Sequence, residues 1–202
     1  MQIVYNTSTH MYTIVGLRNP TPPYANTRHN AGALVVASFV ETVGLPNFVP
    51  SSALVADMSE GTLSGTNVRV LLPNTFMNAS GASVKKAVSD ADSIIVVHDD
   101  LDIPIGAFKV SVGRGSGGHN GVESVVRSLG SQEFIRLRVG ICPVSLFGNA
   151  HRPKGDRIAD FVLKDFTKRE RSRLEARMPD MVAALKMIVE EGVAKTMNAY
   201  NA

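Results

Sequence analysis

The chain of 202 residues is 44% hydrophobic and 19% charged, with 17 Gly and 10 Pro, which suits one domain that buries a sizeable core and excludes a disordered, collagen-like or coiled-coil protein. The formal net charge is +3, and residues 101–202 hold 16 basic and 11 acidic residues. A basic second half indicates an acidic partner, with nucleic acid as the first candidate, and the alternative is a solvated helical surface rich in Lys and Arg.

Apolar periodicity, broken by Gly and Pro, predicts strands that alternate with helices. In chain order we expect strand 12–16, loop 18–27, helix 30–43, strands 54–58 and 68–72, helix 78–88, strands 93–97 and 107–112, glycine loop 113–118, helix 120–129, strand 134–141, loop 142–156 and a helical segment at 167–192. The apolar run at 93–97 is continuous, as in buried central strands, whereas 134–141 alternates. Pro179 either begins a new helix or kinks one. This order predicts an α/β fold with a mixed, largely buried sheet and no interdomain linker.

Cys142 is the only cysteine, so we expect no intramolecular disulfide, no cysteine-based zinc site and a reducing compartment. The longest apolar runs are far shorter than the ~20 residues of a membrane helix, so no membrane partner is expected. Residues 1–11 contain no basic region followed by an apolar core, which a secretory signal would have. They also lack the Arg of a mitochondrial presequence, so we expect a cytoplasmic location and leave a mitochondrial one open.

Four polar clusters lie at the junctions between predicted strands, loops and helices. They are residues 18–30 (RNPTPPYANTRHN), 73–78 (PNTFMN), 98–102 (HDDLD) and 117–121 (GGHNG). Proteins of the α/β class usually build their sites just beyond the carboxyl ends of the strands. We therefore regard these four clusters as the candidate site.

His29 lies at the start of a predicted helix, where a neutral imidazole can accept a proton from water. The positive end of a helix disfavours the imidazolium, which helps to keep the ring a base. Such a base needs a carboxylate on its other nitrogen, and Asp99 and Asp100, which directly follow the central strand, are the natural suppliers. The alternative is that His29 caps the helix and the Asp residues solvate a turn.

Three asparagines, Asn19, Asn78 and Asn120, lie where loops meet strands or helices. Each of them alone could be a turn residue or a helix N-cap. Together with His29 and Asp99 they form a set of amide donors and acceptors. Such a set suits a substrate with peptide and ester carbonyls, which need orientation and stabilisation of an oxyanion.

The glycine loop matches the dinucleotide pattern G-x-G-x-x-G at Gly113, Gly115 and Gly118, between a strand and a helix. A dinucleotide site also needs an acidic residue at the end of the next strand, and this sequence has Cys142 there instead. The loop nevertheless keeps a nucleotide-binding module or an oxidoreductase as the second function class.

Other catalytic signatures are missing, because the sequence has no G-x-S-x-G elbow, no Walker A motif and no H-E-x-x-H. The cluster 98–102 could suggest a metal, but no second His has a suitable spacing, so no metal is expected. Cys142 could be a nucleophile, although its place at a strand end before Pro143 favours a packed, inert thiol.

Six sequence blocks together resemble the bacterial-type peptidyl-tRNA hydrolase family. The blocks are 14–20 (IVGLRNP), 24–32 (YANTRHNAG), 73–81 (PNTFMNASG), 98–102 (HDDLD), 117–121 (GGHNG) and 134–140 (FIRLRVG). They follow one another in order, and the resemblance covers about residues 12–200. Residues 1–11 have no counterpart, so we expect an N-terminal extension at 1–11 and one catalytic domain at 12–202.

The resemblance implies a single α/β domain in which helices surround a twisted mixed sheet, and a monomeric enzyme without metal or cofactor. It implies cleavage of the ester between a peptide and the terminal ribose of tRNA. By motif position, His29 is similar to the catalytic base of the family, Asp99 to its supporting carboxylate and Asn19 to the residue that senses an N-blocked amino acid. The implied substrate-binding positions are Tyr24, Phe76, Met77, Asn78 and Asn120.

The basic half adds one candidate tRNA contact, Arg138. It shares one strand face with Arg136, and Arg152 and Lys154 lie in the loop that follows. These cations could bind phosphate, and the alternative is that they pair with acidic side chains of this chain, namely Glu133, Asp156 or Asp160.

Three residues depart from the family pattern. Arg18 stands where the family usually has a small residue, Ser111 occupies a position that is often basic, and Arg114 interrupts a run of glycines. These departures bear on the contacts with tRNA more than on the catalysis.

Overall fold

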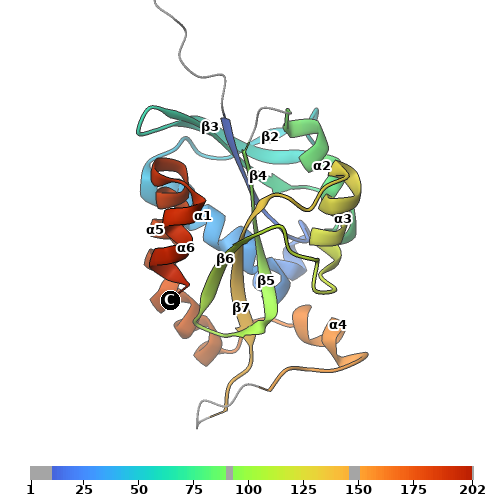
Figure 1. Ribbon diagram of the computed structural model, residues 1–202. Coiled ribbons are helices and arrows are strands. Elements are labelled where there is room, and N and C mark those ends of the chain that lie inside the picture. Colours follow the sequence, from blue (N-terminus) through green and yellow to red (C-terminus); the bar gives the residue numbers. More distant parts are fainter. Residues whose placement is uncertain (1–10, 90–92, 146–150, 202) are drawn as a thin grey trace, which may run out of the picture.

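A seven-stranded mixed sheet forms the centre of the computed structural model, which describes residues 11–89, 93–145 and 151–201 (Figure 1). The strands are β1 (Met11–Gly16), β2 (Val49–Ser51), β3 (Ala56–Leu63), β4 (Thr66–Pro73), β5 (Ser93–Pro104), β6 (Phe108–Val112) and β7 (Ile135–Cys142), in the sheet order β2-β3-β4-β1-β5-β7-β6. The central strands β4, β1, β5 and β7 are parallel. At the two edges, β3 pairs antiparallel with β4, β2 with β3, and β6 with β7. The expected α/β fold with a mixed sheet is confirmed.

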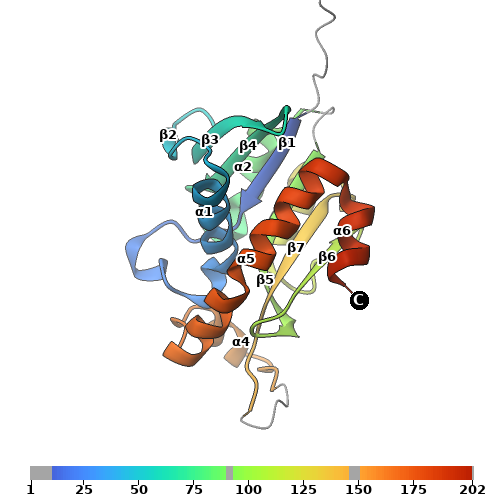
Figure 2. The same cartoon turned by 90° about the vertical axis from the view of Figure 1, so that its left-hand side faces the viewer.

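Helices cover both faces of the sheet (Figure 1, Figure 2). The helices α1 (Ala31–Val43), α5 (Lys168–Glu191) and α6 (Val193–Tyr200) lie on one face, and α2 (Ser80–Ala87) and α3 (Asn120–Leu129) lie on the other. The short helix α4 (Arg157–Val162) lies beyond the ends of the strands, and single 3-10 turns occur at η1 (Pro22–Tyr24), η2 (Arg28–Asn30) and η3 (Met77–Ala79). None of the described helices is long and apolar enough to cross a membrane.

Side chains of the central strands alternate between two apolar clusters. Ile14 and Val97 pack with residues of α1 and α5, whereas Val15 and Val96 pack with residues of α2 and α3. All four side chains are fully buried. Because helices cover both faces, these strands are apolar without a break, which explains why the run at 93–97 indicates a central strand.

Both strands predicted near the site are present, but one is longer and the other more buried than expected. The strand expected at 93–97 continues as β5 to Pro104, because β7 pairs with it beyond the end of β1. Asp99 and Asp100 therefore lie within the strand and do not follow it. The strand expected to alternate at 134–141 is β7, which is buried on both faces along almost its whole length.

The other differences concern boundaries and short elements. The strand expected at 54–58 begins and ends too early, since β3 runs to Leu63 and turns at Ser64–Gly65, where both residues have positive φ. The helix α5 runs through Pro179, so no new helix begins there. The elements β2, α4 and α6 were not predicted. Segments of 3 and 6 residues, as in β2 and α4, are too short for apolar periodicity to show, and α6 is separated from the long α5 by Gly192 alone.

The close approach of α1 to β5 requires a glycine at position 32. A Cβ on Gly32 would lie 2.1 Å from the main-chain carbonyl oxygen of Val97 in β5, which is too close for the two segments to keep their positions. We expect Gly32→Ala to lower the free energy of unfolding by about 1–3 kcal/mol or more, since overpacking must move the backbone. Urea unfolding measures this loss. Gly115→Ala is the control, because a Cβ there meets nothing within 4 Å, and equal stability of the two variants would contradict the prediction.

Candidate active site

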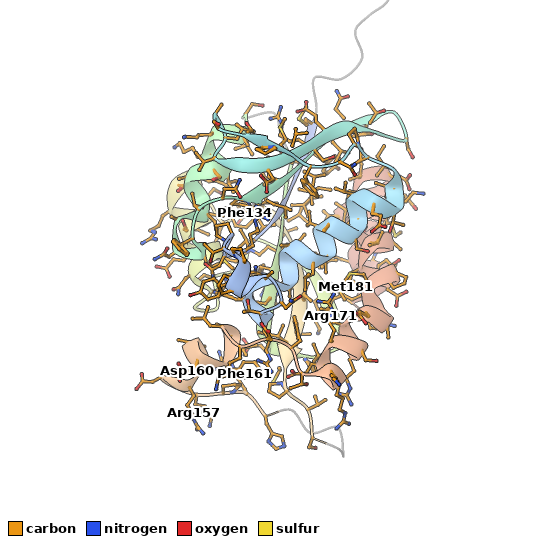
Figure 3. All side chains as sticks on the ribbon, turned by 180° about the vertical axis from the view of Figure 1, so that it is seen from behind. Phe134, Arg157, Asp160, Phe161, Arg171 and Met181 are labelled. Atoms are coloured by element: carbon orange, nitrogen blue, oxygen red, sulfur yellow. The ribbon has the colours of Figure 1, made fainter. Side chains whose placement is uncertain are left out.

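Two neighbouring cavities open at the carboxyl ends of β1, β4 and β5, and both are lined by His29. The larger cavity, about 610 Å³, lies between the end of β5, the glycine loop and α4. The smaller cavity, about 350 Å³, is lined by Asn19, Tyr24, His29, Phe76, Met77, Asn78, Asn120, Ala159, Val162 and Leu163. Figure 3 shows α4, with Arg157, Asp160 and Phe161 labelled, at this end of the molecule. The cavities therefore join all four polar clusters found in the sequence.

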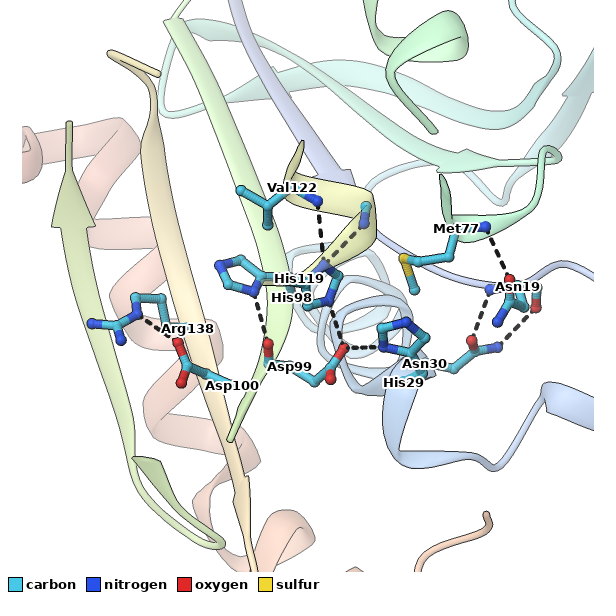
Figure 4. Close-up of polar contacts among 11 residues, drawn as sticks. Asn19, His29, Asn30, Met77, His98, Asp99, Asp100, His119, Val122 and Arg138 are labelled. Carbon is cyan, nitrogen blue, oxygen red and sulfur yellow. Dashed lines mark hydrogen bonds and ion pairs between the residues drawn. The ribbon is translucent and has the colours of Figure 1, made fainter. Parts of the chain in front are cut away.

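His29 and Asp99 meet in the cleft (Figure 4). His29 lies in η2 and Asp99 in β5, and the His29 Nδ1 atom is 2.9 Å from Asp99 Oδ1. The carboxylate accepts this hydrogen bond, so the proton sits on Nδ1 and the lone pair on Nε2. No hydrogen bond to Nε2 occurs within the described parts of the chain. The imidazole is thus held as a base with one nitrogen available to the cleft.

The charge of Asp99 also sets the proton affinity of His29. Burial alone would lower the pKa of His29, but the charge of Asp99 and its hydrogen bond outweigh burial, so the pKa lies above the ordinary value. For Asp99, burial would raise the pKa, while the charges and hydrogen bonds of His29 and His119 hold it well below its usual range. Asp99 is therefore an anion at neutral pH, as a carboxylate that orients a histidine must be.

His119 is a third member of this cluster that the sequence analysis missed. Its Nδ1 accepts hydrogen bonds from the main-chain N–H groups of Gly121 and Val122, which caps α3. Its proton therefore sits on Nε2, which donates to the same Asp99 Oδ1 atom at 2.9 Å. The N-cap role considered for Asn120 thus belongs to His119. The cap considered for His29 is not observed, since Asn30 is the N-cap residue of α1 and no side chain caps that helix. The pattern GGHNG before a helix could have indicated that His119 is an N-cap. It could not show the bond to Asp99, which lies 20 residues away.

His98 supports Asp99 from the main chain. Its Nδ1–H donates to the Asp99 carbonyl oxygen at 2.8 Å, and its ring packs edge-on against His119 with centroids 4.9 Å apart. Burial, together with the charge of His119, lowers the pKa of His98 to about 3. His98 is therefore neutral under ordinary conditions and does not compete with His29 for the proton.

The cluster of His29, Asp99 and His119 has the residue types of a metal site, and its possible ligand atoms lie within 4.8 Å of one another. The spacing argument against a second His was therefore wrong, since His29 and His119 reach Asp99 from other elements. The nitrogens that face Asp99 carry protons, because both donate to the same oxygen. A metal would have to displace both hydrogen bonds, so the arrangement suits an oriented base better than a ligand set.

Asn19 is fixed between two loops. Its Oδ1 accepts the main-chain N–H of Met77 at 2.9 Å. Its own main-chain N–H and C=O bond the side chain of Asn30, at 2.8 and 3.0 Å. Asn19 therefore does not cap a helix of its own segment. It lines the smaller cavity, and its Nδ2 makes no hydrogen bond within the described residues. Asn30 lies in a predicted cluster, but its role as the clamp of Asn19 was missed.

The other predicted substrate residues gather around the smaller cavity. The side chains of Asn78 and Asn120 are exposed, and they make no hydrogen bond within the described residues. Phe76 is 56% exposed although it is a large apolar residue, and Met77 is buried beneath the cavity. Tyr24, the last residue of η1, also lines this cavity. The lining thus combines an apolar surface, which can hold a side chain of a bound peptide, with the amide groups of Asn78 and Asn120, which can bond its carbonyls.

The predicted basic residues divide between the cavity and the surface. Arg138 lines the larger cavity and pairs with Asp100, Nε to Oδ2, at 2.8 Å. Arg152 pairs with Asp102 at 2.7 Å. The pairing with Glu133, Asp156 or Asp160 that was considered is not observed. Lys154 is exposed and lies outside both cavity linings.

The structure weighs against the dinucleotide alternative for the glycine loop. A pyrophosphate would need the free N–H groups at the start of α3. Those of Gly121 and Val122 already donate to His119. Cys142 is buried, and burial raises the pKa of its thiol, so it is not an activated nucleophile.

Arg18, one of the departures from the family pattern, points away from both cavities. Its guanidinium pairs with Asp57 at 2.7 Å and donates to the Pro73 carbonyl oxygen at 3.1 Å. It thereby fastens the end of β1 to β3 and β4. Its role in this chain is structural and does not disturb the cleft.

Comparisons with known proteins agree over nearly the whole chain. A family model described as Peptidyl-tRNA hydrolase matches residues 13–202. The peptidyl-tRNA hydrolase of Citrifermentans bemidjiense is 40% identical over 193 residues, which cover 94% of this chain and 97% of that protein. The peptidyl-tRNA hydrolase of Thermodesulfovibrio yellowstonii is 36% identical over 197 residues, or 95% of this chain and 99% of that protein. The crystal structure of peptidyl-tRNA hydrolase from Acinetobacter baumannii is similar at a TM-score of 0.82 and 32% identity, with 95% of each chain covered.

Proposed function

Because this chain belongs to the peptidyl-tRNA hydrolase family, and hydrolyses the ester that links a peptide to tRNA, we propose that His29 is the general base of this reaction. The observation that carries the proposal is the hydrogen bond of 2.9 Å between His29 Nδ1 and Asp99. It fixes the tautomer in which Nε2 can accept a proton. Asn19 is the third catalytic residue in this proposal, since it holds the substrate beside the base.

The proposed reaction begins with a water molecule that attacks the ester carbonyl carbon. His29 Nε2 takes a proton from this water as the new C–O bond forms, and Asp99 stabilises the imidazolium. The tetrahedral oxyanion then collapses, the bond to the ribose oxygen breaks, and His29 returns its proton to that oxygen. The products are a peptide carboxylic acid, which loses its proton to solvent, and tRNA with a free hydroxyl. Asn78 and Asn120, with their unpaired amides, are our candidates to donate hydrogen bonds to the oxyanion.

We propose that the cleft is divided between the two parts of the substrate. The smaller cavity, with Tyr24, Phe76 and Met77, takes the end of the peptide. The larger cavity, with Arg138 and the glycine loop, takes the end of the tRNA. His29 lines both cavities, so the scissile ester would lie at their junction.

Asn19 would select substrates whose amino group is blocked. Since its Oδ1 is occupied by Met77, Nδ2–H is the group that faces the substrate, and it can donate to the carbonyl of a blocked amino group. A free α-amino group is cationic and has no such carbonyl. We expect Asn19→Asp to reduce the ratio of hydrolysis of acetylated to free aminoacyl-tRNA by about tenfold, because a carboxylate attracts the cation. The same change at the exposed Asn26 is the control, and an unchanged ratio in Asn19→Asp would count against this role.

Arg138 would contact the tRNA through the guanidinium nitrogens that Asp100 leaves free. Arg138→Ala should weaken binding of full-length tRNA substrates and flatten the salt dependence by roughly one unit of slope. Hydrolysis of a minimal ester that carries only the terminal nucleoside should change much less. Lys154→Ala is the comparison. We expect it to weaken tRNA binding less than Arg138→Ala, because Lys154 lies outside both cavity linings. Equal losses on both substrates for Arg138→Ala would place Arg138 in the chemistry or the fold.

We further propose that residues 12–202 act as a single catalytic domain, as a monomer in the cytoplasm and without metal or organic cofactor. The family match over residues 13–202 supports the domain assignment. Residues 1–10 of the expected extension lie outside the described residues, and Met11 already belongs to β1.

The test of the proposed function is the release of free tRNA from an N-blocked aminoacyl-tRNA by the purified full chain. Wild-type protein should release tRNA, and His29→Ala protein of intact fold should not. A parallel titration with NAD(H) and NADP(H) should show no binding. Nucleotide binding without tRNA release would favour the second function class.

A further inference from the structure

We propose that Arg114 binds a phosphate group of the tRNA substrate in the larger cavity, an inference that rests on the proposed placement of the tRNA end there. Arg114 lies on the glycine loop between β6 and α3. Arg114 is exposed, and it lines the cavity together with Arg136, Arg138 and Arg152. Four guanidinium groups around one cavity raise the question of which of them is available to a ligand.

Three of these four cations are already engaged. Arg138 pairs with Asp100 at 2.8 Å and Arg152 with Asp102 at 2.7 Å. Arg136 is 2% exposed and donates to the main-chain carbonyl oxygens of Arg114 and Gly115.

Arg114 differs from the other three. Within the described residues its guanidinium makes no hydrogen bond and no ion pair, and only its main-chain carbonyl is used, as the acceptor for Arg136. Asp156, at the start of α4, is the remaining acid of the lining without such a contact. Among the four arginines of the lining, Arg114 is therefore the one whose whole guanidinium is free of contacts within the described residues.

Like charges are crowded at this place. Burial lowers the pKa of Arg136, and the charges of Arg138 and Arg114 lower it further, against the opposing effect of Asp100 and Glu133. The guanidinium of Arg114, on the adjacent loop, repels those of Arg136 and Arg138, and no contact of Arg114 within the described residues offsets this repulsion. A phosphate dianion or diester among these groups would remove the repulsion, and Arg is well suited to bind it through two nitrogens.

The loop around Arg114 leaves room for a sugar-phosphate chain. A Cβ built on Gly115, Gly117 or Gly118 would meet nothing within 4 Å. The loop leads directly to His119, which bonds Asp99, and both line the same cavity as the loop. The clamp of Arg136 on the loop carbonyls fixes the main chain beneath Arg114. Arg114 is thus a cation on a held loop, in the lining of the same cavity as Asp99 but not bonded to it.

The test compares Arg114→Ala with wild type on three substrates: full-length N-blocked aminoacyl-tRNA, a dinucleotide ester with one phosphodiester, and an ester of the terminal nucleoside alone. The alanine variant keeps the carbonyl that Arg136 binds. We expect kcat/KM on full-length tRNA to fall about fivefold to tenfold and its salt dependence to flatten by about 0.7 units of slope. On the nucleoside ester we expect less than a twofold change. Arg114→Lys should recover part of the loss, since it keeps the charge but not the two-nitrogen contact.

Arg127→Ala is the matched control, because Arg127 is an exposed Arg of α3 outside both cavity linings. A loss that begins with the dinucleotide ester would assign Arg114 to the phosphate nearest the ribose, and a loss confined to full-length tRNA would assign it to a more distant phosphate. Either result supports the proposal. Equal losses on all three substrates, or no change beyond that of Arg127→Ala on any of them, would overturn it. If wild-type protein released no tRNA, the proposed function itself would fail, which is a separate outcome.

Discussion

Replacing His29 by alanine should lower kcat on N-blocked aminoacyl-tRNA by about 10²–10⁴-fold, the usual contribution of a positioned general base. The reason lies in the hydrogen bonds of the three histidines around Asp99. His119 uses Nδ1 to cap α3 and Nε2 to bond Asp99, and His98 is buried with its Nδ1–H on a carbonyl. Only His29 has a nitrogen lone pair that is open to the cleft, so no other group of the cluster can take its place.

His151→Ala is the control for this experiment, because His151 is exposed and lines neither cavity. Circular dichroism and urea unfolding should show that His29→Ala keeps its fold, since Asp99 retains the hydrogen bond from His119. Near-normal turnover by the folded His29→Ala protein would end the assignment of the base.

Asp99→Asn should lower kcat about ten- to hundredfold, less than His29→Ala, because the imidazole remains and only its orientation and charge stabilisation are lost. A neutral amide also removes the charge that raises the pKa of His29, while burial, which lowers that pKa, stays. His29 must be neutral to act, so activity is lost as pH falls through its pKa. The acid limb of kcat/KM should therefore move to lower pH in Asp99→Asn.

Asp102→Asn is the matched control for the carboxylate. Asp102 lies on the same strand and lines the larger cavity, but its side chain is 56% exposed and pairs with Arg152, not with a histidine. We expect this variant to keep both its rate and its pH profile. If Asp102→Asn were crippled and Asp99→Asn were not, the wrong carboxylate would have been chosen.

The sequence predicts the central part of the fold well because two physical signals coincide there. Continuous apolar runs indicate strands that are covered on both faces, and glycines such as Gly44 and Gly130, in left-handed conformation, end α1 and α3. Short elements were missed where neither signal operates. The helix α4 is one of them. Arg28 donates to the carbonyl oxygens of Phe161, in α4, and Lys164, just after it, a long-range contact that no local pattern shows.

The sequence predicts the main residues of the candidate site, but not all of the hydrogen bonds that join them. His29 and Asp99 follow from the need of a base for a carboxylate, and the structure brings them to hydrogen-bond distance. That His119 shares the same oxygen, and that Asn30 holds Asn19, depends on how β1, β5 and α3 are placed in space. The resemblance was needed for Tyr24 and Phe76, because single exposed aromatic residues in loops carry no chemical signal of their own.

The most direct test of the central claim is to measure the pKa of His29 by NMR in the free enzyme and compare it with the acid limb of kcat/KM. If His29 is the base held by Asp99, the two values should coincide above the ordinary 6.5, and both should fall together in Asp99→Asn. An acid limb that differs from the titration of His29, or that persists unchanged in the residual activity of His29→Ala, would contradict the claim.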